Sequence, residues 1–268
     1  MGKKMKSQLK VVSGALMLAL AGHAMAATDW LTPTVAQKTN PGTITVGTAT
    51  ATPTAWAGGD GETLVQQLGT SSTATTHFAD YTGGGLGINN SLDGEAYGAQ
   101  PDHAIDNFGR QEMVLLTFFD KAVNLTALTM GYVSGDADFT VMAFNVNGVT
   151  GAPTLGTGTN KTWNSLGVSG SGWTLIGDYQ NSTTGTKTFA NSYYSSYWLI
   201  GAYNPLVGIM AGFASDNTAD YFKLSSVSGN VCTATSGNCG SKVPEPSSLA
   251  LLGLGIMGVL RMRKARKV

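Results

Sequence analysis

The sequence has few of the side chains on which most catalytic sites depend. Its 268 residues include three histidines and two cysteines. Only two of the histidines, His77 and His103, lie beyond Ala26. There is no G-x-S-x-G nucleophile elbow and no H-E-x-x-H zinc motif, which mark many hydrolases and metalloproteases. We therefore expect a protein that is not an enzyme.

Basic side chains are scarce away from the two ends of the chain. Nine of the 16 Lys and Arg side chains lie in segments 1–26 and 244–268, which leaves seven basic side chains against 15 acidic ones between them. The net charge of this central body is therefore about −8. Because phosphate binding needs clustered Lys and Arg, we expect no nucleic-acid partner.

Glu and Lys, which favour long helices, are also few, whereas Gly, Thr, Ser and Ala are abundant. Glycine costs about 1 kcal/mol per helical position relative to Ala, and β-branched residues lose rotamer freedom in helices. Short β-branched and aromatic runs recur between clusters of turn-forming residues, as in β proteins. For a body that extends from 27 to 243, this predicts an all-β fold, a single antiparallel β-sandwich that is jelly-roll-like.

The composition of individual stretches predicts where the strands lie. We expect strands at 43–50, 73–81, 112–119, 123–132, 138–146, 173–179, 198–203, 205–213 and 220–227. The segment 62–67 fits either a short strand or a helical turn. The segment 55–61 and the glycine-rich 83–87 are expected to be turns, and 148–171 a surface excursion. The shared Leu-Ile-Gly-x-Tyr of 175–179 and 199–203 indicates two similar strands in one sandwich.

The segment 1–26 has the pattern of a secretory signal peptide. Four lysines between positions 3 and 10 precede an apolar core at 11–21, and Ala24-Met25-Ala26 is a small-x-small cleavage site. We expect cleavage after Ala26, with cleavage after Ala27 as the alternative.

The segment 244–268 combines three features without a gap. Pro244-Glu245-Pro246 is a rigid polar triad, since each proline fixes φ. An uncharged apolar run from Leu249 to Leu260 would be roughly 18 Å long as a helix, against about 30 Å of bilayer hydrocarbon. It is followed by a basic end that would stay on the cytoplasmic side. This end contains Arg261, Arg263, Lys264, Arg266 and Lys267.

This tail resembles a PEP-CTERM sorting signal, the kind processed by exosortases in Gram-negative bacteria. The resemblance implies an exosortase-type enzyme as partner, transient anchoring in the inner membrane, and delivery to the cell surface or extracellular matrix. An ordinary, retained membrane anchor is the alternative. The expected organisation is a signal peptide at 1–26, a β-sandwich surface domain at 27–243, and a sorting tail at 244–268 with a short apolar helix in the precursor.

Four stretches of the body resemble a family of exosortase-dependent surface proteins. They are PDHAIDN (101–107), GDADFTVMAFN (135–145), SSYWLIGAYN (195–204) and DYFKL (220–224). The resemblance spans roughly 83–229 and implies a surface role without enzymatic activity. We expect a structural or adhesive protein, with extracellular polysaccharide as a partner. Aromatic side chains at 193, 194, 197 and 198 could stack on sugars, or could belong to the core.

The segment 88–109 is the most polar stretch of the body, and it includes Asp102, His103, Asp106 and Asn107. We interpret these four residues as a ligand loop. Because His103 lies between two aspartates, a secreted carbohydrate-active hydrolase is the alternative function.

Two further features concern metal and redox chemistry. Asp136 and Asp138 lie on the same side of an extended segment, because alternate residues do. They could make half of a calcium site, completed by the Asp93–Asp106 loop or by Asp216 and Asp220; turn-forming aspartates that cap their own backbone are the alternative. The two cysteines, Cys232 and Cys239, form an even pair in an exported chain, which predicts a disulfide.

Overall fold

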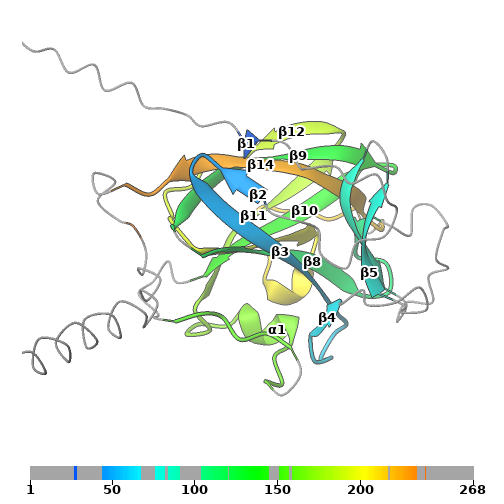
Figure 1. The fold of residues 1–268 in the computed structure, drawn as a ribbon. Coiled ribbons are helices and arrows are strands. Elements are labelled where there is room, and N and C mark those ends of the chain that lie inside the picture. Colours follow the sequence, from blue (N-terminus) through cyan, green and yellow to red (C-terminus); the bar gives the residue numbers. More distant parts are fainter. Residues whose placement is uncertain are drawn as a thin grey trace, which may run out of the picture.

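The β-branched and aromatic runs form strands that pair into two antiparallel sheets packed face to face (Figure 1). The computed structural model describes residues 27–28, 44–67, 76–81, 84–90, 104–119, 121–144, 151–156, 159–216, 218–233 and 239. Within this part of the chain every strand pairing is antiparallel. The prediction of an all-β antiparallel sandwich is confirmed.

The first sheet is eight-stranded in the described part of the chain. Its order is β1 (Ala27–Thr28), β2 (Ile44–Val46), β3 (Ala49–Gly58), β8 (Gln111–Phe118), β13 (Tyr197–Ala202), β10 (Ala137–Phe144) and β11 (Trp173–Ser182), and β4 (Val65–Gln67) also pairs with β3.

The second sheet is six-stranded in the same part of the chain. Its order is β12 (Gly185–Thr188), β9 (Val123–Val133), β14 (Tyr221–Val231), β6 (Gly85–Asn90) and β5 (Thr76–Tyr81), with β7 (Ile105–Asp106) beside β14. The edge strands β11 and β12 are consecutive in the sequence, so the chain passes from the first sheet to the second at this edge of the sandwich.

The main core lies between the two sheets. Alternate residues of β8, such as Val114, Leu116 and Phe118, face inward and are fully buried. Residues of β9 and β14 on the opposite sheet pack against them. Trp198 lies in the same core and donates its indole N–H to the Val123 carbonyl over 3.1 Å. This interleaving removes the apolar side chains of both sheets from water, which is the main driving force for folding.

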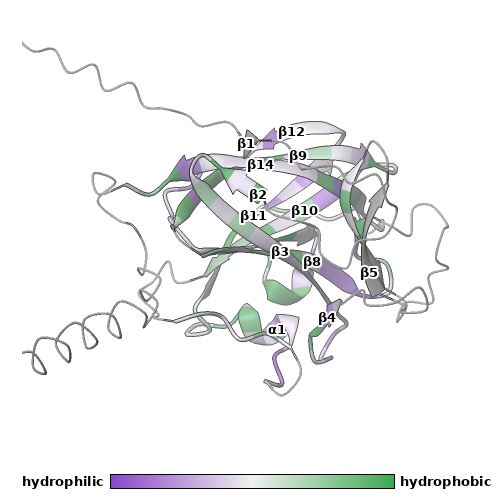
Figure 2. Cartoon of the chain, in the orientation of Figure 1, coloured by the Kyte–Doolittle hydropathy of each residue, from purple (hydrophilic) through white to green (hydrophobic). Residues whose placement is uncertain are grey.

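A third layer covers the outer face of the first sheet. It contains the short helix α1 (Trp163–Leu166) and the 3-10 helix η2 (Pro205–Val207), which carry hydrophobic residues beneath β3 and β8 (Figures 1 and 2). Trp163 is fully buried there and donates its indole N–H to the Gln111 carbonyl over 3.1 Å. Thr162 and Ser165 form a capping box that begins the helix. Because both faces are covered, every residue of β10 is buried.

In its described part, the segment expected to be a surface excursion, 148–171, is mostly exposed or half-buried, but one turn of it packs onto the first sheet. The Gly- and Thr-rich composition hides a single apolar turn, whose Trp163 and Leu166 fill a second core cluster. A helix of one turn is too short for a periodic pattern to reveal it.

Several other elements differ from expectation. The predicted strand at 43–50 is a hairpin, because Gly47 adopts φ 58° and the chain reverses between β2 and β3. The expected turn at 55–61 is partly strand, since β3 continues to Gly58. The expected strand at 205–213 is η2 followed by a loop, and β12 was not expected.

The glycine-rich stretch expected to be a turn contributes the beginning of β6. Gly85 has φ +103°, and a Cβ there would lie 2.6 Å from the Leu224 carbonyl oxygen. Glycine is thus required by the close approach of β14, rather than by flexibility. The two Leu-Ile-Gly-x-Tyr segments are, as expected, similar strands in one sandwich: β11 and β13 flank β10 on either side.

Cys232 and Cys239 are bonded to each other at the end of β14, with their Cα atoms 5.6 Å apart. The Cys232 N–H donates to the Ala122 carbonyl over 2.8 Å, which fixes the disulfide to the beginning of β9. In the described part of the chain, no helix has the length and hydrophobicity that crossing a membrane requires. The apolar tail and its expected helix lie outside the described residues.

Candidate functional site

Three aspartates meet at one end of the sandwich, and we call them the acidic cluster. Asp136 precedes β10, Asp138 lies within β10, and Asp220 immediately precedes β14. One carboxylate oxygen from each lies within 4.8 Å of the other two. The Ser134 N–H donates to the Tyr221 carbonyl over 3.1 Å, so the β9–β10 turn is held against the beginning of β14. This contact joins two segments that are far apart in the sequence.

Asn107 and backbone groups hold Asp220 in place. The Asp220 carboxylate accepts the Asp138 N–H over 2.6 Å and the Asn107 side-chain amide over 2.7 Å. Asn107 in turn accepts the Asp220 N–H over 2.8 Å and donates to the Tyr203 carbonyl over 3.1 Å. Asp138 and Asp220 are 2% and 1% exposed. The cluster is therefore a built, rigid arrangement and not a group of surface carboxylates.

Burial is the largest influence on the protonation of Asp220. It raises the pKa of Asp220 to about 7, and the negative charges of Asp138 and Asp136 act in the same direction. The hydrogen bonds from the Asp138 N–H and the Asn107 amide lower the pKa but do not outweigh burial. Three carboxylates so placed repel one another when ionised, and a bound cation would remove this cost.

The remaining member, Asp136, has an unused acceptor. Its Oδ2 atom is buried and has no hydrogen-bond partner among the described residues. The donor set is made of oxygen atoms only, which are the ligands that hard divalent cations such as Ca²⁺ prefer. The residues present therefore fit a calcium ion, for which Asp136, Asp138 and Asp220 would be the protein ligands.

The predicted ligand loop is divided by the structure. Asp102 and His103 lie outside the described residues. Asp106 lies in β7 and is fully buried, and its carboxylate accepts the Phe108 N–H over 2.9 Å. Its own N–H donates to the Glu112 side chain over 3.2 Å. Asp106 thus belongs to the interior of the sandwich, while Asn107 supports the acidic cluster.

Of the two completions suggested for a calcium site, the Asp93–Asp106 loop brings none of its described residues into the cluster, whereas the pair Asp216 and Asp220 brings one. Asp220 joins Asp136 and Asp138, whereas Asp216 stays outside the cluster. The Asp216 carboxylate accepts hydrogen bonds from the backbone and hydroxyl of Thr218, which lower the pKa of Asp216. Asp216 is therefore a turn-forming residue.

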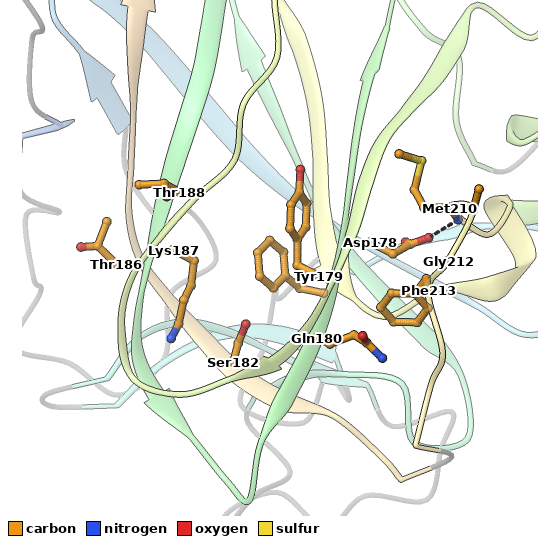
Figure 3. A pocket seen from close by; sticks show the side chains of 12 residues that line it. Asp178, Tyr179, Gln180, Ser182, Thr186, Lys187, Thr188, Met210, Gly212 and Phe213 are labelled. Atoms are coloured by element: carbon orange, nitrogen blue, oxygen red, sulfur yellow. Dashed lines mark hydrogen bonds between the residues drawn. The ribbon is translucent and has the colours of Figure 1, made fainter.

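A second candidate site lies at the edge of the sandwich where β11 and β12 meet the loop after η2, and we call it the edge cleft. It encloses about 610 Å³, within the range common for ligand pockets. Figure 3 shows the residues that line it. Thr186, Lys187 and Thr188 come from β12, and Asp178, Tyr179, Gln180 and Ser182 come from β11. The loop with Met210 and Phe213 lies on the other side. None of these residues was predicted as a site, because β12 and the loop after η2 were not foreseen.

Two side chains of β11 attach this loop to the strand. Asp178 accepts the Met210 N–H over 2.9 Å and the Thr140 hydroxyl over 2.7 Å (Figure 3). Gln180 donates to the Ala214 carbonyl. Burial raises the pKa of Asp178, and its two hydrogen bonds oppose that rise. The loop thus forms a fixed wall of the cleft.

Aromatic rings line both the strand side and the loop side of the edge cleft. Phe139 and Tyr179 are stacked with centroids 4.7 Å apart, and Phe213 packs on Tyr203 at 4.5 Å. None of the four aromatic residues suggested from the sequence for sugar stacking lines this cleft. Trp198 is fully buried in the core and Tyr197 packs against the second cluster, whereas Tyr193 is exposed and Tyr194 is half-buried.

The sorting tail is identified by comparison with protein families. The segment 242–266 matches the family model of the PEP-CTERM protein-sorting motif. The chain carries a PEP-CTERM sorting signal. The match includes the Pro-Glu-Pro triad, the apolar run and all of the basic end except Lys267. A PEP-CTERM signal implies export, surface sorting in Gram-negative bacteria, and processing by an exosortase-type enzyme. No curated protein and no solved structure matches the chain.

Proposed function

We propose that the body between the leader and the PEP-CTERM signal is a non-enzymatic structural or adhesive protein of the cell surface or extracellular matrix, and that it binds extracellular polysaccharide. The observation that carries the proposal is the edge cleft. It combines fixed aromatic and apolar walls with hydroxyl, carboxamide, carboxylate and ammonium groups. Such mixed lining suits sugars, which present both C–H surfaces and hydroxyl groups.

Several features support a binding role over catalysis. The carboxylates of the acidic cluster lie at the end of the sandwich, and Asp220 is engaged by Asn107 and a backbone N–H. In the edge cleft, Asp178 is the carboxylate among the lining residues, and both of its oxygens accept hydrogen bonds that hold a wall in place. Glycoside hydrolysis commonly requires two carboxyl groups facing one bond, which the described residues of this lining do not offer.

We also propose that Ca²⁺ occupies the acidic cluster and stabilises the body. The unpartnered Oδ2 of Asp136 and the buried carboxylates of Asp138 and Asp220 support this assignment. The ion would fasten the β9–β10 turn to the beginning of β14. Its role would be structural, because Asp138 and Asp220 are inaccessible to a polymeric ligand.

The test is a binding screen of the exported protein against soluble polysaccharides, with calcium and with a chelator. We expect retention of at least one polysaccharide in affinity electrophoresis, without release of reducing ends. Release of reducing ends that is abolished by His103→Ala, in a variant that stays folded, would instead establish the carbohydrate-active hydrolase. Failure of every polysaccharide to bind would refute the proposed binding role.

A further inference from the structure

We propose that the edge cleft binds a segment of an uncharged, hydroxyl-rich polysaccharide, with Lys187 as hydrogen-bond donor and Asp178 as acceptor. This inference rests on the polysaccharide-binding function proposed above and names its ligand class. It follows from the unused hydrogen-bonding capacity of the cleft, from its charge, and from the shape of its walls.

Lys187 brings unused donors into the cleft. An ammonium group has three N–H donors and no acceptor. Among the described residues, Lys187 makes one hydrogen bond, to the Thr183 hydroxyl over 3.3 Å. Its side chain is half-buried on β12, beside the exposed Thr186 and Thr188. The remaining N–H donors of Lys187 can therefore bind acceptor atoms of a ligand in the cleft.

Asp178 provides the complementary acceptors on the opposite strand. Each of its oxygens accepts one hydrogen bond, from Thr140 and from Met210. A carboxylate has about four acceptor positions, so capacity remains on both oxygens. A sugar hydroxyl is a donor and an acceptor at once. A ligand with many hydroxyls can therefore satisfy Asp178 and Lys187 together.

The charges favour an uncharged polymer over an anionic one. Lys187 and Asp178 carry opposite charges, so the two charged residues of the lining cancel. The body as a whole has a net charge of about −8, which repels polyanions within a Debye length. A neutral polymer meets neither this repulsion nor the cost of desolvating its own charge.

The apolar part of the lining fits the C–H surfaces of sugars without ring stacking on Tyr179. One face of Tyr179 is already covered by Phe139, and the ring also contacts Phe189 with centroids 5.7 Å apart. Met210, which is 40% exposed, and Phe213 provide the accessible apolar wall. The polar groups of β11 and β12 then orient the bound polysaccharide by hydrogen bonds.

The experiment measures the affinity of the full exported protein for dextran and galactomannan, which are neutral, and for alginate and polygalacturonate, which are anionic. We expect binding to a neutral polymer that changes little with ionic strength. Lys187→Met should weaken this binding by at least about tenfold, because a hydrogen bond from a charged group is lost. Lys121→Met is the matched control, since Lys121 also donates one hydrogen bond to a threonine hydroxyl, that of Thr48, but lies outside the cleft.

A second variant, Thr188→Val, keeps the shape of an exposed β12 residue and removes its hydroxyl, and it should also weaken binding. Circular dichroism establishes that each variant is folded. Preference for alginate or polygalacturonate with strong salt dependence would overturn the ligand class while leaving polysaccharide binding intact. Unchanged affinity in both cleft variants would overturn the site, and failure of all four polymers would remove the proposed function itself.

Discussion

Replacement of Asp136 by Asn tests the acidic cluster most directly. Asparagine has nearly the same shape as aspartate but removes one of three mutually repelling charges. In the calcium-free protein, Asp136→Asn should leave stability unchanged or raise it, because the unpartnered Oδ2 contributes no hydrogen bond among the described residues. With calcium present, the same variant should lose most of the stabilisation that the wild type gains. The variant therefore separates a metal ligand from an ordinary turn residue.

The size of the calcium effect follows from ligand linkage. Extracellular modules bind calcium with dissociation constants of about 10⁻⁴–10⁻³ M. At tenfold excess over the dissociation constant, binding to the folded state adds about 1.4 kcal/mol. For a body of this length, which extends from 27 to 243, about 1 kcal/mol shifts Tm by about 2–4 °C. We therefore expect calcium to raise Tm by about 3–6 °C, and EDTA to reverse the rise.

Differential scanning calorimetry with calcium or EDTA measures this shift. Asp216→Asn is the matched control, because Asp216 bonds to Thr218 in its own turn and lies outside the cluster; it should retain the full calcium response. Equal shifts in the wild type and Asp136→Asn, or no shift in the wild type at saturating calcium, would refute the metal assignment.

Three further predictions follow from the structure, and a fourth follows from the two ends of the sequence. Without calcium, the free energy of unfolding should fall as pH rises from about 4 to 7, by at most about 1.4 kcal/mol per pH unit. The reason is that the pKa of Asp220 is raised from 3.8 to about 7 in the folded state, so the fold disfavours the ionised carboxylate. Urea denaturation in EDTA at several pH values measures this free energy, and a rise across that window contradicts the prediction. Trp163→Ala should cost about 3–5 kcal/mol in urea denaturation because Trp163 is fully buried, whereas Val168→Ala, at a residue 58% exposed, should change stability by less than about 0.5 kcal/mol. Reduction of the Cys232–Cys239 disulfide, or Ser at both positions, should cost about 2–3 kcal/mol, as expected for closing so short a loop; an unchanged denaturation midpoint would show that the loop is already ordered without the bond. The intact mass of protein from the outer surface or medium should lack Met1–Ala26 and everything beyond about Pro246; retention of Leu249–Val268 would identify a permanently membrane-anchored protein.

Local patterns in the sequence were sufficient for features that depend on neighbouring residues. The apolar stretch at 112–119 predicted a central buried strand, and β8 lies between β3 and β13. The alternation at 123–132 predicted β9, and the even pair of cysteines predicted the disulfide. In each case one short segment contains the whole signal. The burial of Trp163 could not be predicted from its own Gly- and Thr-rich stretch, because Trp163 packs against Leu64, Val207 and strands that are far away in the sequence.

The acidic cluster could be predicted only in part from local sequence patterns. The spacing of Asp136 and Asp138 placed two carboxylates on one side, and Asp220 was one of several acids that could complete a site. Asp220 joins the cluster, and Asp216 does not, because β14 pairs with β9 and the Ser134 N–H donates a hydrogen bond to the Tyr221 carbonyl. Asn107 was assigned to a ligand loop, although its amide spans from Tyr203 to Asp220.

By itself, the sequence determined where the protein goes and what class of fold it has. The Pro-Glu-Pro triad, the apolar run and the basic end are contiguous, so the PEP-CTERM signal is complete in one segment, and strand and turn preferences act over short stretches. Only the tertiary structure decided which side chains meet. The acidic cluster joins Asp136 and Asp138 to Asp220, and the edge cleft joins β11, β12 and the loop after η2. Their positions depend on strand pairing and on a core formed by the whole body, and no single segment records that pairing.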